Sequence, residues 1–195
     1  KVAIKVLLTA RLAGGKPEVE FERFDREVKF IASLHHPNIV RLIDSGKIGL
    51  QMLYMVLEYI EGESLAQMIA RNEKLSVSAT TELMLQVLDA LACAHDLGIV
   101  HRDLKPANIM VMKTGVRYNA KILDFGISSI VDSARDASYQ TLTSMDEVFG
   151  TAPYMAPEQV SKVAVTPQTD IYAWGLIFIE ALTGKSPIPA GDLIT

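Results

Sequence analysis

The first part of the chain, up to about residue 62, has the hydrophobic pattern of strands around one helix. Val2–Leu8 is a run of apolar and β-branched residues, which predicts a strand. From Glu18 to Leu34, apolar residues recur every three or four positions, which predicts an amphipathic helix. Two further apolar runs, Ile39–Ile43 and Leu53–Tyr59, predict two more strands. This part is therefore strand-rich.

The rest of the chain has a mainly helical pattern. Ser64–Arg71 predicts a short helix that its first serine can cap, and Val77–Leu97 predicts a long helix that a glycine ends. Thr169–Thr183 is largely apolar and predicts a buried helix, also followed by a glycine. Asp132–Glu147 is rich in Ser, Thr and Asp without any period, so it predicts a loop. Short strands are predicted around Ile99-Val100, Ile109–Met112 and Lys121–Leu123.

These elements predict an α+β fold made of two unequal parts. Residues 1–57 form the smaller, strand-rich part, residues 58–62 a connector, and residues 63–195 the larger, mainly helical part. The total of 195 residues lies within the usual range of one domain. We therefore expect two lobes of one domain.

Composition excludes several classes of protein. Hydrophobic residues make up 49% and charged residues 22%, which suits a packed core and not a disordered tail. The net charge of −4 argues against a nucleic-acid binder. Cys93 is the single cysteine, so no internal disulfide can form. The most apolar run, Ile171–Leu182, is too short to cross a bilayer. Because no signal peptide opens the chain, we expect a cytoplasmic domain, even if a longer parent is tethered to a membrane.

Four short motifs carry the candidate chemistry. They are Val2-Ala3-Ile4-Lys5, His101-Arg102-Asp103-Leu104-Lys105-Pro106-Ala107-Asn108, Asp124-Phe125-Gly126, and Ala156-Pro157-Glu158 with Gly150-Thr151 before it. With these four motifs in this order, the sequence resembles the eukaryotic-type (Hanks-type) protein kinase family over essentially its whole length. The resemblance implies a two-lobed kinase fold. It also implies that this chain is a piece of a longer one, since the glycine-rich loop expected before Val2 and the last helices expected after Thr195 are not in it.

Phosphoryl transfer depends on charge neutralisation and alignment, and the motifs offer groups for both. Lys5 offers a compact cation for ATP phosphates, although an edge-strand lysine can also be merely solvated. Glu27 lies next to the apolar stripe of its helix and is the expected partner of Lys5, with Glu20, Glu22 and Asp25 as rivals. The resemblance favours Glu27.

The second and third motifs supply the other expected catalytic and metal-binding groups. Asp103 would accept or orient the proton of the substrate hydroxyl, and Lys105 would neutralise the phosphate in transfer. Asn108 and Asp124 offer hard oxygen ligands that suit Mg²⁺. By resemblance, Thr151 contacts Asp103 and Lys105 from the peptide-docking side. A lone Asp in a loop is more often a turn former, so these roles depend on the whole set.

The resemblance also implies a site for ATP between the lobes. The stretch Leu57-Glu58-Tyr59-Ile60, where the smaller part meets the connector, would hold the adenine, with Leu57 as gatekeeper and with Glu58 and Ile60 alongside it. Ala3 and Met110 would sandwich the ring, although both positions also suit ordinary packing. His101 would support by packing the catalytic loop, which is residues 101–108, and would not act as a base.

Two features indicate the substrate class. Lys105 follows Asp103 by two residues, which is the serine/threonine pattern, and the segment Gly150 to Glu158 agrees with it. Arg102 could pair with a phosphate in the activation loop, and self-phosphorylation at Thr141, Thr143 or Ser144 is expected. The residues of several motifs are similar to those of the same motifs in bacterial family members. Two alternatives remain open: a pseudokinase that only binds ATP, and a small-molecule kinase of the aminoglycoside phosphotransferase type.

Overall fold

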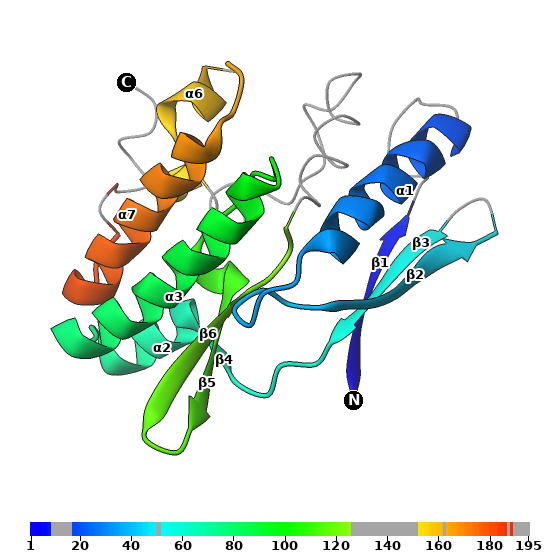
Figure 1. Ribbon diagram of the computed structural model, residues 1–195. Coiled ribbons are helices and arrows are strands. Elements are labelled where there is room, and N and C mark those ends of the chain that lie inside the picture. Colours follow the sequence, from blue (N-terminus) through cyan, green and yellow to red (C-terminus); the bar gives the residue numbers. More distant parts are fainter. Residues whose placement is uncertain (9–16, 50–51, 126–151, 162, 187, 189–195) are drawn as a thin grey trace.

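The computed structural model describes residues 1–8, 17–49, 52–125, 152–161, 163–186 and 188 (Figure 1). These residues form a small antiparallel sheet with one helix, and a larger part in which α-helices pack on one another and against a β-hairpin. Figure 1 shows the two parts side by side, the smaller in blue and cyan and the larger in green to red. The α+β fold in two lobes is thus confirmed.

The smaller part is a three-stranded antiparallel sheet covered by one helix. The strands are β1 (Val2–Leu8), β2 (Leu42–Ile48) and β3 (Met52–Glu58), in the order β1-β3-β2, and the helix is α1 (Pro17–Ser33). Alternate residues of β3 are buried, which follows from the two-residue repeat of a strand. The helix closes the core because its apolar stripe faces the same side of the sheet. The buried residues of this core are Phe24, Ile31, Leu53 and Met55.

The larger part contains a second sheet, β4-β5-β6, and the helices α2, α3, α6 and α7. The strands are β4 (Glu63–Ser64), β5 (Ile109–Thr114) and β6 (Arg117–Ile122). The helices are α2 (Leu65–Asn72), α3 (Val77–Asp96), α6 (Pro157–Val160) and α7 (Pro167–Thr183), with short 3₁₀ turns η2 (Pro106–Asn108) and η3 (Ala152–Tyr154). By length and composition α3 could cross a membrane, but it packs against β6 and α7. Its fully buried residues, including Leu83, Met84, Val87 and Leu91, make it the central core helix.

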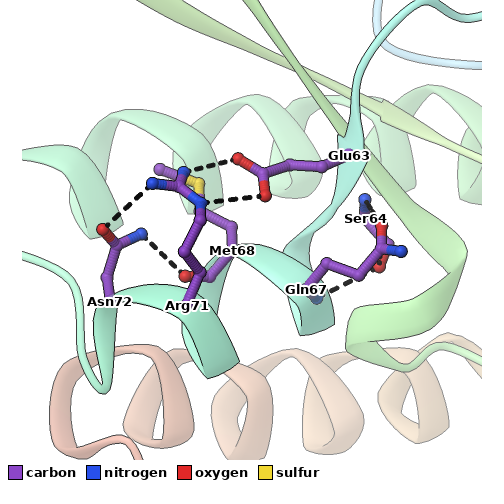
Figure 2. A network of polar contacts seen from close by, with 6 residues as sticks. All are labelled: Glu63, Ser64, Gln67, Met68, Arg71 and Asn72. Carbon is purple, nitrogen blue, oxygen red and sulfur yellow. Dashed lines mark hydrogen bonds and ion pairs between the residues drawn. The ribbon is translucent and has the colours of Figure 1, made fainter.

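Residues at the helix ends explain where α2 begins and where α7 ends. Ser64 and Gln67 form a reciprocal capping box at the start of α2, as the serine predicted. Figure 2 shows this cap beside a two-pronged ion pair, in which Arg71 binds Glu63 with its shortest N–O distance at 2.6 Å. At the end of α7, Gly184 caps the helix with φ of 73°, a left-handed conformation that favours glycine.

Backbone hydrogen bonds join the two parts of the fold. Val40 N–H donates to the Ile122 carbonyl at 2.9 Å, and Ile122 N–H donates to the Asn38 carbonyl at 2.8 Å. The Asn38 side chain adds a bond to the Ala120 carbonyl at 2.7 Å. The segment before β2 is therefore fixed to β6 as a short parallel bridge between Ile39 and Ile122. This bridge sets the smaller part in place over the end of β6.

Three sequence predictions are corrected. The strand predicted at Ile39–Ile43 begins only at Leu42, because Ile39 pairs with β6 instead. Ile99-Val100 is not a strand; its apolar side chains contribute to packing without a strand partner. Helix α7 is not buried all round: Ile177 is fully buried, but Ile171 and Ile179 are 42% and 47% exposed. Overall apolarity does not reveal which helix face meets the core.

Candidate active site

The segment between α3 and β5 brings Asp103, Lys105 and Asn108 together. Asn108 donates its side-chain N–H to the Asp103 carboxylate at 3.1 Å and to the Asp103 carbonyl at 2.8 Å. Lys105 Nζ lies 3.1 Å from Asp103 Oδ2. The 3₁₀ turn that Pro106 opens brings this about, since it folds Asn108 back onto the residues before it. The loop thus holds Asp103, Lys105 and Asn108 close together.

Asp124 reaches the same site from the other side of the β5–β6 hairpin. Asn108 immediately precedes β5, and Asp124 follows β6 by two residues. Because Ile109 pairs with Ile122 in this hairpin, both ends arrive at one edge. Leu123 N–H then donates to the Asn108 carbonyl at 2.8 Å, which closes the ladder beside the site. The catalytic loop and the residue expected to bind metal are thus connected through two strands and one hydrogen bond.

Lys5 extends from the smaller part to Asp124. Its Nζ lies 2.9 Å from Asp124 Oδ2, and both side chains are about one-third exposed. Asp124 has φ of 60°, an unusual value for a non-glycine residue. This ion pair was not foreseen from the sequence. Glu27 lies on α1 as predicted, but its side chain is outside the described residues, so the Lys5–Glu27 pair stays a prediction.

His101 supports the loop from within the core, as expected. The ring is fully buried and lies edge-on to Phe125, with the ring centroids 4.8 Å apart. Its Nδ1 accepts the Asp103 backbone N–H at 3.2 Å, so the ring proton is on Nε2, which donates to the Leu123 carbonyl at 2.8 Å. Since both ring nitrogens are engaged, His101 is unsuited to take a proton from a substrate.

Asp170 supports this loop from within the core, a role that the sequence analysis missed. Its carboxylate is 1% exposed and accepts hydrogen bonds from the backbone N–H groups of His101, at 2.8 Å, and Arg102, at 2.9 Å. His95 of α3 donates its Nε2–H to the same carboxylate at 2.8 Å. A carboxylate in the first turn of a largely apolar helix was the available signal, because a buried charge needs partners.

The connector between the parts is held by Glu58. Its carboxylate binds Lys121 of β6 at 2.7 Å and the Arg41 backbone N–H at 2.8 Å. Burial raises the pKa of Glu58, but the bonds from Lys121 and Arg41 outweigh it, so the pKa is lowered overall. The side chain of Glu58 therefore ties the connector to the larger part.

The remaining residues of the expected nucleotide site lie on β1, β3, β5 and the connector. Ala3 of β1 is exposed and lies opposite buried Leu57 of β3. Met110 of β5 is half-buried and pairs with Ser64 of β4, and Ile60 of the connector is half-buried. These positions come from the two sheets that flank the connector, which is the arrangement a ring bound between them needs.

The oxygen donors of Asn108 and Asp124 fit Mg²⁺. Both hydrogen bonds donated by the Asn108 side-chain amide go to Asp103, and no described residue donates to the Asn108 Oδ1. Among the described residues no group of three or more His, Cys, Asp or Glu could hold a metal. Mg²⁺ usually binds one or two protein oxygens together with phosphates and water, so a two-residue donor set is appropriate to it.

The end of the segment Gly150 to Glu158 packs against α7. Glu158 accepts a hydrogen bond from the Thr169 hydroxyl at 2.6 Å, which lowers the pKa of Glu158. Tyr154 donates its hydroxyl to Glu180, and burial together with that bond raises the pKa of Tyr154. Thr151 and the expected phosphorylation sites lie outside the described residues; those sites are Thr141, Thr143 and Ser144.

Known proteins resemble this chain throughout. Residues 1–194 match the family described as "Protein kinase domain". The probable serine/threonine-protein kinase PknB of Lactococcus lactis is 40% identical over 99% of this chain, and serine/threonine-protein kinase PrkC of Bacillus subtilis is 38% identical over 100% of it. The chain spans only 29% and 28% of those two proteins. Among solved structures, a mutant form of the Mycobacterium tuberculosis PknI kinase domain has a TM-score of 0.71 and 29% identity, covering 97% of this chain and 66% of that one. The chain belongs to the protein kinase family.

Proposed function

We propose that the protein containing this chain is a serine/threonine protein kinase, which transfers the γ-phosphoryl group of ATP to protein hydroxyls with Mg²⁺. The observation that carries the proposal is the convergence of Lys5, Asp103, Asn108 and Asp124, with Lys5 2.9 Å from Asp124 and Asn108 3.1 Å from Asp103. The names of the PknB and PrkC relatives support the substrate class.

Asp103 is the residue that meets the substrate hydroxyl in this proposal. Its carboxylate is 30% exposed, so a hydroxyl can reach it, while Asn108 and Lys105 hold its orientation. Lys105 is close enough to turn from Asp103 toward a phosphoryl oxygen. Thr151 is proposed to approach both residues from the peptide side.

Lys5, Asn108 and Asp124 form the phosphate end of the nucleotide site. Mg²⁺, when bound with ATP, neutralises charge on the phosphates. Asn108 Oδ1 and the Asp124 carboxylate would hold the ion, and Lys5 would move from Asp124 to share the phosphates. Glu27 would then hold Lys5 in place from α1. The adenine would lie between Ala3 and Met110, beside Leu57 and the connector residues Glu58 and Ile60.

Further expectations belong to the same proposal. The division into residues 1–57, 58–62 and 63–195 describes the two lobes and the connector between them. Thr141, Thr143 and Ser144 are candidate self-phosphorylation sites, with Arg102 as a partner for the added charge. A cytoplasmic location suits a kinase that consumes ATP.

The test is phosphate transfer by the full-length protein. The protein is incubated with Mg²⁺ and γ-labelled ATP, and with either a generic protein substrate such as myelin basic protein or kanamycin. Label on serine and threonine of the protein, with none on kanamycin, is expected. Label on kanamycin would favour the small-molecule alternative. ATP binding without transfer to either acceptor, or to the kinase itself, would favour the pseudokinase.

A further inference from the structure

The residue before Asp103 has a strained backbone. Arg102 has φ of 69°, in the left-handed region that L-residues other than Asn and Asp rarely adopt. Such a conformation persists only where surrounding contacts over-determine it. Since Asp103 follows directly, the contacts that hold Arg102 also set the direction in which Asp103 leaves the chain.

The peptide group joining Arg102 to Asp103 is held at both of its polar ends. Its N–H, on Asp103, donates to His101 Nδ1 at 3.2 Å. Its carbonyl, on Arg102, accepts from Gln159 Nε2 at 2.7 Å. Asp170 binds the preceding two N–H groups and does not reach this carbonyl. Gln159 therefore supplies a contact that Asp170 cannot supply.

Both ends of the Gln159 side-chain amide are used. Gln159 is half-buried in the single turn of α6, and its oxygen accepts the backbone N–H of Ala156 at 3.1 Å. Ala156, which is fully buried, and Glu158 belong to the segment Gly150 to Glu158, which by resemblance to protein kinases is the peptide-docking segment. The amide thus connects that segment to the catalytic loop through one donor and one acceptor.

We propose that Gln159 is a positioning residue that couples the end of the peptide-docking segment to the catalytic loop. It fixes the Arg102 carbonyl, and hence Asp103, when Ala156 is in place. A shift of this segment would release the strained Arg102 peptide and misdirect the Asp103 carboxylate. The proposal depends on the proposed function for the role of Asp103, but the coupling itself is structural.

Gln159→Glu in the full-length protein tests the coupling, because glutamate has the same shape but its carboxylate cannot donate to the Arg102 carbonyl. The kcat for phosphorylation of a protein substrate should fall about tenfold or more at pH 8, the effect expected from setting a charge against a half-buried carbonyl. The KM for ATP should change less than about twofold, since Lys5 and Asp124 are untouched. Gln168→Glu makes the same change at an exposed position of α7 and should leave kcat unchanged.

The pH profile separates this role from general destabilisation. Once protonated, the carboxyl group that Gln159→Glu introduces can again donate to Arg102 and accept from Ala156. The activity of the Gln159→Glu variant relative to wild type should therefore rise as the pH falls from about 8 to about 6, toward the usual range of a glutamate pKa. Gln159→Leu cannot regain the bonds and should show a flat ratio. A flat or falling ratio for the glutamate variant, or normal kcat in it, overturns the proposal.

Hydrogen exchange reads the coupling without any transfer of phosphate. In the Gln159→Glu variant, amide protons of residues 101–108 should exchange faster than in wild type at pH 8, whereas those of α3 should not. Unchanged exchange in 101–108 overturns the proposal even if the protein is an active kinase. An inactive wild-type protein with faster exchange in the variant would instead overturn the proposed function and leave the coupling standing.

Discussion

Lys5 and Asp124 form an ion pair, with 2.9 Å between Lys5 Nζ and Asp124 Oδ2, that crosses from the sheet of the smaller part to the end of β6. Both residues belong to motifs that would bind nucleotide and metal. Exposure of about one-third on each side leaves the pair open to solvent, so its contribution to stability is small. In the proposed function this pair opens, with Lys5 turning to the phosphates and Asp124 to Mg²⁺.

Asp124→Asn should nearly abolish Mg²⁺-dependent phosphorylation in the full-length protein. The amide keeps the shape of the side chain, so the fold should be retained. It loses the charge that attracts the ion, so transfer should fail. Phosphate transfer at saturating Mg²⁺ and the far-UV circular dichroism spectrum measure the two effects. Asp25→Asn, at an exposed carboxylate paired with Lys47, is the matched control and should be fully active. Near wild-type transfer by Asp124→Asn would contradict the metal assignment.

Asp103→Ala should reduce kcat by about a hundredfold or more, while the Kd of ATP changes much less. The reason is that Asp103 would meet the substrate hydroxyl, whereas the nucleotide is held by other residues. Rapid-quench kinetics for transfer and fluorescence titration for ATP separate the two quantities. A variant that loses ATP affinity but transfers phosphate normally once saturated would contradict this role.

Glu27→Gln should lower kcat/KM for ATP, because Lys5 loses the partner that holds it toward the phosphates. The neighbouring acids are the controls: Glu22→Gln and Asp25→Asn lie at exposed positions of the same helix and should have little effect. A double-mutant cycle with Lys5→Met should show coupling for Glu27 alone. Because ion pairs lose much of their gain in desolvation, the free energy of unfolding should change little. Coupling of Lys5 to Glu22 or Asp25 instead would exclude Glu27.

Glu58→Gln should remove part of the acid sensitivity of folding. The folded pKa of Glu58 is lowered, so its stabilising effect is present above the unfolded value of about 4.3 and is lost as the pH falls through the lower folded value. The variant should be less stable than wild type by about 1–2 kcal/mol at pH 6–7, and this difference should shrink toward about pH 3. Denaturant unfolding across that pH range measures it; a constant difference would contradict the assignment.

Gly184→Ala should destabilise the fold more than Gly98→Ala. Both glycines have left-handed backbones, with φ of 73° and 74°. A Cβ at Gly184 would collide with the Glu73 carbonyl oxygen, whereas one at Gly98 would meet nothing within 4 Å. Gly98→Ala therefore reports backbone strain alone, about 1 kcal/mol, and Gly184→Ala adds a collision with backbone. Thermal unfolding of both variants gives the comparison, and equal losses would contradict it.

Local patterns gave most of the elements correctly. Val2–Leu8 is a strand over the predicted residues, and Ser64 caps α2 as its sequence position suggested. Both depend on interactions between residues close in the chain. The start of β2 and the isolated bridge at Ile39 were not predictable in this way, since Ile39 pairs with Ile122, far along the chain.

The candidate site divides along the same line. The motifs identify Asp103, Asn108 and Asp124 through the resemblance to protein kinases, and their residue types suit phosphoryl transfer. They do not reveal that Asp170 holds the catalytic loop through His101 and Arg102. A carboxylate that binds backbone N–H groups imposes no residue type on its partners, so the partner sequence carries no sign of it.

The sequence by itself determined the family, the order of most strands and helices, and the residue types available for chemistry, because these follow from short-range patterns and fixed motifs. Only the tertiary structure decided that Lys5 pairs with Asp124, and that Gln159 reaches the Arg102 carbonyl. It also decided which face of α7 is buried. Each of these depends on the relative placement of segments distant in the chain, which packing of the whole core fixes and no local pattern encodes.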